Sequence, residues 1–114
     1  MTDSTSILNR LMQVIEARRQ SPSEKSYTTR LMAGGVTKMG EKIMEEAAEV
    51  VEAAGAGDSR DAHDHLVHEA ADLVYHLMVL LGHRRTDWTE VETELARRFG
   101  ISGLDEKSSR QANQ

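Results

Sequence analysis

The sequence contains no cysteine and only one proline among its 114 residues. Without cysteine the chain has no disulfide framework and no thiolate metal site, which suits a reducing cytoplasm. No stretch approaches the roughly 18–20 apolar residues that a membrane-spanning helix requires. The first ten residues, MTDSTSILNR, lack the basic stretch and the apolar run of a secretory signal peptide. We therefore expect a cytoplasmic protein with no membrane partner.

Positive charge is also scarce, with 14 Lys+Arg against 19 Asp+Glu and a net charge of −5. This balance gives no general attraction for a nucleic-acid backbone, so nucleic acid is not an expected partner. An anionic small ligand would need local basic side chains or a metal ion. Length and composition fit one globular domain, for which we predict residues 1–110, followed by a flexible tail at 111–114.

No segment alternates apolar and polar residues in the manner of a half-buried strand. Apolar residues recur instead at helical spacing, and Gly34-Gly35 marks a hinge or a helix start after the segment SYTTRLMAGGV. We predict an all-α, four-helix bundle-like fold. The predicted helices cover residues 5–20, 36–54 and 60–82 and the segment TDWTEVETELARRFG.

Two of these helices carry the predicted core. A helix that is apolar on most sides is buried on most sides, and the helix over 60–82 is of this kind. We therefore expect an oligomer, while a central helix in a monomeric bundle remains the alternative. The core face of 36–54 comprises Val36, Met39, Ile43, Ala47, Val50 and Ala54. That of 60–82 comprises Leu66, Ala70, Leu73, Leu77 and Leu80, widened by Val74, Met78, Val79 and Leu81.

The glutamates of MEEAAEVVEAAG fall into two kinds when each residue advances ~100° around the helix. With Ile43 at zero, Glu41, Glu45 and Glu52 fall opposite the core face and read as solvated charges. Glu46 falls at about −60° and Glu49 at about −120°, at the edge of the core face.

The next helix repeats this arrangement, since EAADLV at 69–74 matches EAAEVV at 46–51 after a shift of 23 positions. Glu69 and Asp72 lie on the same flank of their helix as Glu46 and Glu49 on theirs. A helical hairpin would bring the two flanks together. Four half-buried carboxylates need a countercharge, and an all-oxygen site suits Mg²⁺ or Mn²⁺. Flanking charges paired with lysine or arginine are the alternative. A di-iron site is disfavoured, because no Glu is followed by His three residues later.

At these residues the chain resembles the all-α nucleoside-triphosphate pyrophosphohydrolases, the MazG-like superfamily. Four segments are similar, more narrowly, to the phosphoribosyl-ATP pyrophosphatase family: SYTTRL, GGVTKMGEKIMEEAAEVVEA, HEAADLVYHLMVLL and RRFGISGLDEKSSR. The resemblance covers about residues 26–110. It implies a MazG-type homodimer that hydrolyses phosphoribosyl-ATP to phosphoribosyl-AMP and pyrophosphate, the second step of histidine biosynthesis. It also implies that Glu46, Glu49, Glu69 and Asp72 bind Mg²⁺.

Other residues are candidates for supporting roles. Glu45 is the adjacent candidate for a general base, although its helical phase argues against it. The candidates for substrate binding are Tyr27, Arg30, Lys38, Lys42, Lys107 and Arg110. For Lys42 a local salt bridge to Glu46 is an equal alternative. His76 reads as a structural residue or a partner of the metal ligands, and His63, His65 and His68 as a solvated tract.

Two other functions remain open. A house-cleaning pyrophosphatase for deoxynucleoside or damaged triphosphates would keep the chemistry and change the substrate. A dimeric helical scaffold with acidic faces would have no activity at all.

Overall fold

The computed structural model describes residues 6–100, which contain five α-helices and no strand. The all-α prediction is confirmed, but one more helix forms than the four predicted. The additional helix lies in SYTTRLMAGGV and begins where the Ser26 hydroxyl accepts a hydrogen bond from the Thr29 N–H at 3.1 Å. The helices are α1 (Ile7–Gln20), α2 (Tyr27–Ala33), α3 (Gly35–Ala54), α4 (Arg60–His83) and α5 (Trp88–Phe99).

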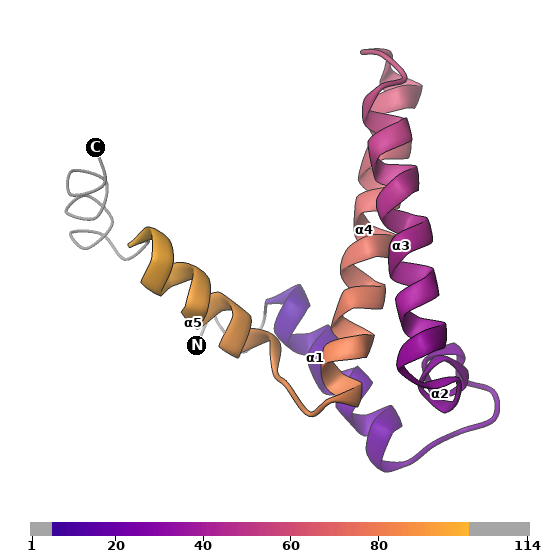
Figure 1. Ribbon diagram of the computed structural model, residues 1–114, viewed down its shortest axis with the longest axis vertical. Helices are drawn as coiled ribbons and strands as arrows, with labels where there is room; N and C mark the ends of the chain where they lie inside the picture. The colour runs from indigo at the N-terminus through magenta and orange to yellow at the C-terminus, as the bar shows by residue number, and fades with distance from the viewer. Residues whose placement is uncertain (1–5, 101–114) are drawn as a thin grey trace.

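Helices α3 and α4 form a long antiparallel hairpin, which stands upright in Figure 1. Gly57 adopts a φ of +110° in the connection, a conformation open to glycine. Ser59 then caps α4, because its side chain accepts a hydrogen bond from the Ala62 N–H at 3.1 Å. The hairpin that the sequence predicts is therefore present, and it brings the two acidic flanks to one place.

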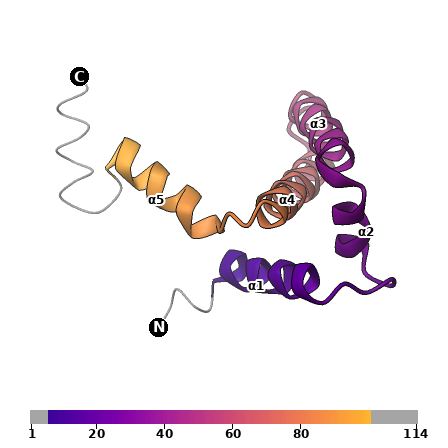
Figure 2. The same ribbon diagram turned by 60° about the horizontal axis from the view of Figure 1, so that its bottom comes forward.

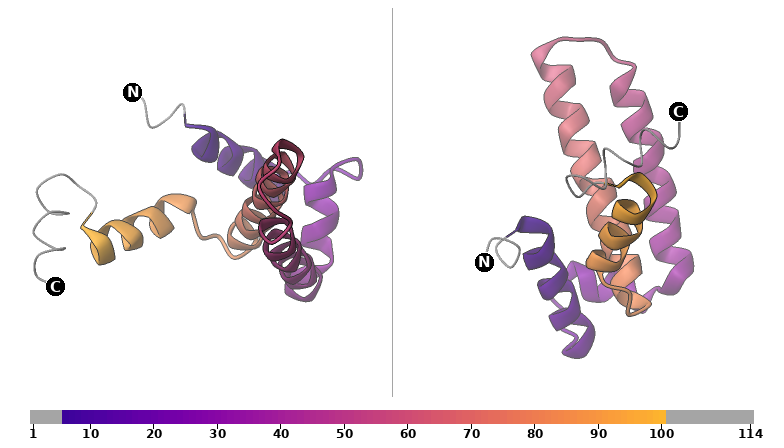
Figure 3. Two further views of the ribbon diagram at one scale, coloured as in Figure 1. Left: turned by 90° about the horizontal axis from the view of Figure 1, so that it is seen from above. Right: turned by 90° about the vertical axis from the view of Figure 1, so that its left-hand side faces the viewer.

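Helix α4 is the central helix of the described chain, with α3 along one side and α1 across its C-terminal half (Figures 1 and 3). Met78 and Val79 are fully buried with Ile15 of α1. The two helices approach closely at Gly82, where an added Cβ would lie 2.7 Å from the Ile15 side chain. Part of the wide apolar surface of α4 is thus covered within one chain, as the monomeric alternative proposes.

The predicted core face of α3 is only partly correct. Met39 is buried, but Val36 is 53% exposed and Ala54 is exposed, while Ala53 is buried in its place. Val36 and Ala54 lie in the end turns of α3, where fewer neighbours cover a helix than at its middle. Met44 and Val51 are each 72% exposed, so a second side of α3 carries apolar groups into solvent.

Helix α2 packs against both helices of the hairpin near its base, whereas α5 extends away from it (Figures 1 and 2). Asp87 and Glu90 form a capping box at the start of α5, and Gly100 ends the helix in the left-handed conformation. No residue of α5 is buried. No described helix is both long and apolar enough to cross a membrane.

Candidate active site

Three glutamates converge between the two helices of the hairpin. Glu46 and Glu49 come from α3 and Glu69 comes from α4, and each offers an oxygen within 4.8 Å of the other two. Glu46 is 9% exposed and Glu69 is 8% exposed. The helical phases predicted this convergence, because both flanks border the face on which α3 and α4 pack.

The two buried carboxylates are incompletely satisfied. The Oε1 atoms of Glu46 and Glu69 are buried and have no hydrogen-bond partner. A buried charged oxygen without a partner loses its hydration and gains nothing in return. These two oxygens thus face the carboxylate cluster without a partner among the described residues.

The acidity of these groups reflects their position. Burial, proton sharing with Glu69 and the charge of Glu49 raise the pKa of Glu46 to about 7. Hydrogen bonding with Glu69, followed by burial, raises the pKa of Glu49. Carboxylates that are buried beside other carboxylates resist ionisation, and a nearby cation would reverse this effect.

Asp72 lies at the edge of this group. It forms a second set of candidate ligands with Glu69 and His68, whose ligand atoms also lie within 4.8 Å of one another. The Nε2 atom of His68 is 3.4 Å from the Asp72 Oδ2 atom. Glu69 belongs to both sets, and the charge of Asp72 contributes to the raised pKa of Glu46.

The sequence reading missed the proximity of His68 to the carboxylates. Helix α4 begins at Arg60, as predicted, so His68 lies one turn before Asp72. His65 has the same relation to Glu69, with its Nδ1 atom 3.7 Å from the Glu69 Oε2 atom. The spacing of four residues between histidine and acid was the available signal.

This donor set fits a divalent cation. Carboxylate oxygens are the ligands that Mg²⁺ and Mn²⁺ prefer, and the two unpartnered Oε1 atoms lack a positive group. The roles of Glu46, Glu49, Glu69 and Asp72 as metal ligands stay predictions, supported by this fit.

The neighbouring charged residues of α3 are placed differently. The Nζ atom of Lys42 is 3.5 Å from the Glu45 Oε1 atom, so its ion pair is with Glu45 and not with Glu46, the partner considered as the alternative to substrate binding. The Glu45 side chain is 57% exposed and lies outside both ligand sets. Its charge nevertheless helps to raise the pKa of Glu49, so it borders the site. Lys38 is exposed and has no ion pair within residues 6–100.

Helix α2 places Tyr27 and Arg30 beside the hairpin. The Tyr27 hydroxyl is 3.0 Å from the Nε2 atom of His76, a buried residue one turn after Asp72. The Arg30 guanidinium lies over the Tyr27 ring, 5.8 Å from its centroid. The predicted substrate-binding residues Lys107 and Arg110 lie outside the described residues.

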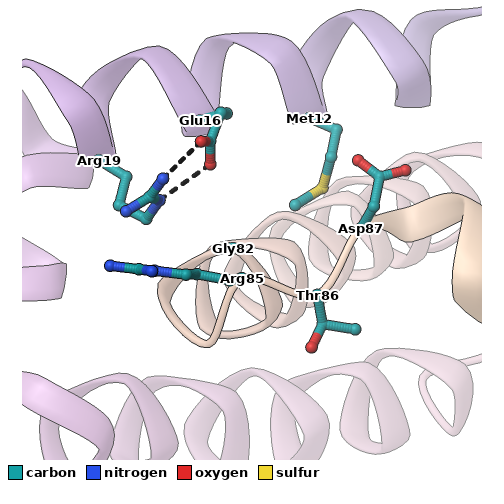
Figure 4. Close-up of a pocket in the computed structure, with 7 residues that line it drawn as sticks. All are labelled: Met12, Glu16, Arg19, Gly82, Arg85, Thr86 and Asp87. Carbon is teal, nitrogen blue, oxygen red and sulfur yellow. Dashed lines mark hydrogen bonds and ion pairs between the residues drawn. The ribbon is translucent and has the colours of Figure 1, made fainter.

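A separate hollow of about 230 Å³ lies between α1 and the turn that follows α4 (Figure 4). It lies at Gly82, thirteen residues beyond Glu69 and therefore about 20 Å further along α4. Glu16 is held there by Arg19, whose Nη2 atom is 2.6 Å from the Glu16 Oε2 atom. The hollow thus contains a neutralised carboxylate, and the carboxylates of the hairpin do not line it.

The fold and the site define a class: an all-α protein whose central hairpin carries a carboxylate cluster that suits divalent cations. A family model described as phosphoribosyl-ATP pyrophosphohydrolase matches residues 8–99. The chain belongs to this family.

Three relatives, each named phosphoribosyl-ATP pyrophosphatase, cover nearly the whole chain. The protein from Rhodopirellula baltica is 48% identical over 112 residues, which are 98% of this chain and 92% of the relative. The protein from Geotalea daltonii is 47% identical over 104 residues, 91% of this chain and 94% of the relative. The protein from Erythrobacter litoralis is 48% identical over 103 residues, 90% of this chain and 95% of the relative.

Proposed function

We propose that this chain hydrolyses phosphoribosyl-ATP to phosphoribosyl-AMP and pyrophosphate, the second step of histidine biosynthesis. Membership of the family supports the substrate and the reaction. The structural observation that carries the proposal is the pair of buried, unpartnered oxygens on Glu46 and Glu69. A bound cation would stabilise the ionised form of such a site, and a polyphosphate substrate needs such a cation.

Glu46, Glu49 and Glu69 would hold Mg²⁺, or Mn²⁺ in its place, and Asp72 would complete the ligand set from the edge. When bound, the ion neutralises phosphate oxygens and lowers the pKa of a bound water molecule. The hairpin contributes by fixing carboxylates from two helices in one position before substrate arrives, which limits the reorganisation needed during reaction.

The reaction itself is a hydrolysis of the α–β phosphoanhydride. Water forms a bond to the α-phosphorus, the bond to the bridging oxygen breaks, and pyrophosphate leaves with that oxygen. The attacking water loses a proton, for which Glu45 is the candidate acceptor, because it is ionisable, exposed and adjacent to Glu49. Lys42 would contact a phosphate after exchanging its weak pairing with Glu45 at 3.5 Å.

The active form would be a homodimer in the cytoplasm. Several large apolar side chains on the hairpin and on α5 are strongly exposed within one chain, and a second copy would cover them. They are Met44, Val51, Val67, Leu95 and Phe99. Light scattering coupled to gel filtration should give about twice the mass of one chain, and the M44E/V51E double variant should give the mass of a monomer.

The test of function is growth. A bacterium that lacks the pyrophosphatase step should grow without histidine when it expresses this chain, and E69Q should not restore growth. Purified protein should release pyrophosphate from phosphoribosyl-ATP in the presence of Mg²⁺. Release only from deoxynucleoside triphosphates would replace the proposal with a house-cleaning activity. Absence of any Mg²⁺-dependent activity or stabilisation would favour a scaffold.

A further inference from the structure

Helix α2 is joined to α4 by two neighbouring hydrogen bonds between side chains. Tyr27 bonds to His76 at 3.0 Å, and Thr28 bonds to Tyr75. The rings reinforce these contacts, since those of Tyr27 and Tyr75 are stacked with centroids 6.2 Å apart. Because His76 is only 6% exposed, this contact between α2 and α4 belongs to the interior of the fold.

The two hydrogen bonds of His76 show which ring nitrogen carries the proton and therefore which group donates in each bond. Its Nδ1 atom is 2.8 Å from the backbone oxygen of Asp72, which can only accept, so Nδ1 carries the proton. In the neutral ring Nε2 is then an acceptor, and the Tyr27 hydroxyl donates to it. His76 thereby fixes the Tyr27 ring from a buried position one turn beyond a predicted metal ligand.

The fixed Tyr27 ring in turn holds Arg30. The guanidinium lies 5.8 Å from the ring centroid, and one of its N–H groups donates to the Glu24 carbonyl oxygen at 3.2 Å. No carboxylate pairs with Arg30 in the described chain, in contrast to Arg19 and Arg97, which each bind a glutamate. Arg30 therefore presents a positioned positive charge whose remaining donors are available to an anion.

This charge lies along the hairpin from the carboxylates. Seven residues separate Glu69 from His76, a rise of about 10 Å along α4. Lys42 is electrostatically coupled to both regions, because Glu45, the Tyr27 phenol and Glu46 all contribute to raising its pKa. Seven positions are nearly two full turns, so Glu69 and His76 share a face of α4, and Tyr27, over which Arg30 lies, bonds to that face.

The proposed substrate has a matching distribution of charge. Its triphosphate lies at one end, and the ribosyl group attached to the base carries a separate 5′-phosphate. We propose that Arg30 binds this 5′-phosphate and that Tyr27 and His76 are positioning residues that hold Arg30 for it. This inference rests on the proposed function and adds a basis for preferring phosphoribosyl-ATP to ATP.

Kinetics with purified variants test the inference. R30Q should raise KM for phosphoribosyl-ATP by roughly tenfold or more, the usual loss for a hydrogen bond to a charged group, with kcat nearly unchanged. Y27F and H76L should raise KM less, because each only loosens Arg30. H76Q should restore KM toward the wild-type value, since the glutamine side-chain oxygen can accept the Tyr27 hydrogen bond.

Binding without turnover provides the second readout. In the presence of EDTA, calorimetry should show that R30Q and H76L weaken binding of phosphoribosyl-AMP but leave binding of AMP unchanged, since AMP lacks the second phosphate. Y75F is the matched control, because it removes the neighbouring Thr28 bond between the same helices. It should lower the melting temperature without changing KM or the preference for phosphoribosyl-AMP.

The outcomes separate the two proposals. If the wild-type protein does not hydrolyse phosphoribosyl-ATP, the proposed function fails and this inference fails with it. If it does, but folded R30Q and H76L keep the wild-type KM and affinity for phosphoribosyl-AMP, only the inference is overturned. Equal effects of H76L, H76Q and Y75F on KM would also overturn it, since they would show that any weakening of the contact between α2 and α4 suffices.

Discussion

Two glutamate motifs of the same spacing behave in opposite ways in this molecule. In α1, Glu16 has Arg19 three residues later, and the bidentate contact lowers the pKa of Glu16 to about 2. In α3, Glu46 has Glu49 three residues later, and burial beside other carboxylates raises the pKa of Glu46 to about 7. The first carboxylate has its countercharge within the helix, and the second has none among the described residues.

The difference lies in what the second helix contributes. Glu16 is satisfied by its own helix and lines a hollow at the molecular surface (Figure 4). Glu46 faces α4, which adds the further carboxylate of Glu69 and buries both. A locally paired charge is a feature of one helix, whereas a convergent and unpaired cluster needs the tertiary fold and is costly to maintain. Such a cost is typical of a functional site.

The largest expected effect is on turnover in E69Q. Glu69 belongs to both candidate ligand sets, so the substitution should reduce kcat by more than about 100-fold, given that changing even the hydrogen-bonding partners of metal ligands costs roughly 10–100-fold. Steady-state release of pyrophosphate from phosphoribosyl-ATP measures this. E16Q is the control from the other motif and should retain wild-type kcat. Equal losses in E69Q and E16Q would remove the distinction between the two motifs.

The second expected effect is stabilisation by metal. At a free Mg²⁺ concentration of 100 times Kd, binding to the folded state adds about 2.7 kcal/mol, which raises Tm by on the order of 10 °C. Thermal unfolding with and without Mg²⁺ measures this shift. E46Q should lose most of it, and E16Q should keep it in full. A wild-type Tm that ignores Mg²⁺ would contradict the proposed metal site.

Much of the fold could be predicted from the sequence, because its signals are local. Helical periodicity, the Ser59 cap and the Asp87–Glu90 capping box each depend on residues a few positions apart. Helix α2 was missed because it has only seven residues, too few for a periodic pattern. The burial of Met78 and Val79 was expected, but their packing with Ile15 of α1 was not, since no pattern within α4 indicates which neighbour covers which side.

In the site, too, features set by local spacing could be predicted, whereas features set by tertiary packing could not. The convergence of Glu46, Glu49 and Glu69 followed from helical phase once a hairpin was assumed. The pairing of Lys42 with Glu45 instead of Glu46 did not, because both partners are available at helical spacing and side-chain rotamers decide between them. The bond between Tyr27 and His76 spans 49 positions and depends on where α2 packs, which the sequence pattern leaves open.

The third expected effect is a pH dependence of stability in the metal-free protein. The pKa of Glu46 rises from 4.5 to about 7 on folding, so the folded state binds more protons than the unfolded state between these values. Stability should therefore fall as pH rises through this window and level off above it. Tm measured in EDTA from pH 4 to 8 tests this.

The contribution of Glu46 is isolated by subtracting the profile of E46Q, which leaves the other titrating groups in place. The difference between wild type and E46Q should grow as pH rises from 4.5 to 7. A difference that does not vary with pH would show that Glu46 ionises normally. Saturating Mg²⁺ should abolish or reverse the slope, because the ion favours the charged carboxylate.

The smallest expected effect concerns the direction in which Tm changes in two matched variants, E46Q and E16Q, in EDTA at pH 8. E46Q removes a buried carboxylate that is repelled by its neighbours, so it should raise Tm. E16Q removes a carboxylate whose charge is matched by Arg19, so it should lower Tm. The second change should be slight, because the Glu16 side chain is 42% exposed and solvent screens exposed ion pairs strongly.

The pKa of Glu16 is lowered from 4.5 to about 2, so the stabilisation that its carboxylate contributes is complete above pH 4.5 and disappears as pH falls toward 2. The wild-type and E16Q proteins should therefore converge in Tm near pH 2. If both E46Q and E16Q instead lower Tm at pH 8, the hairpin cluster, like the α1 pair, is already neutralised by its own chain.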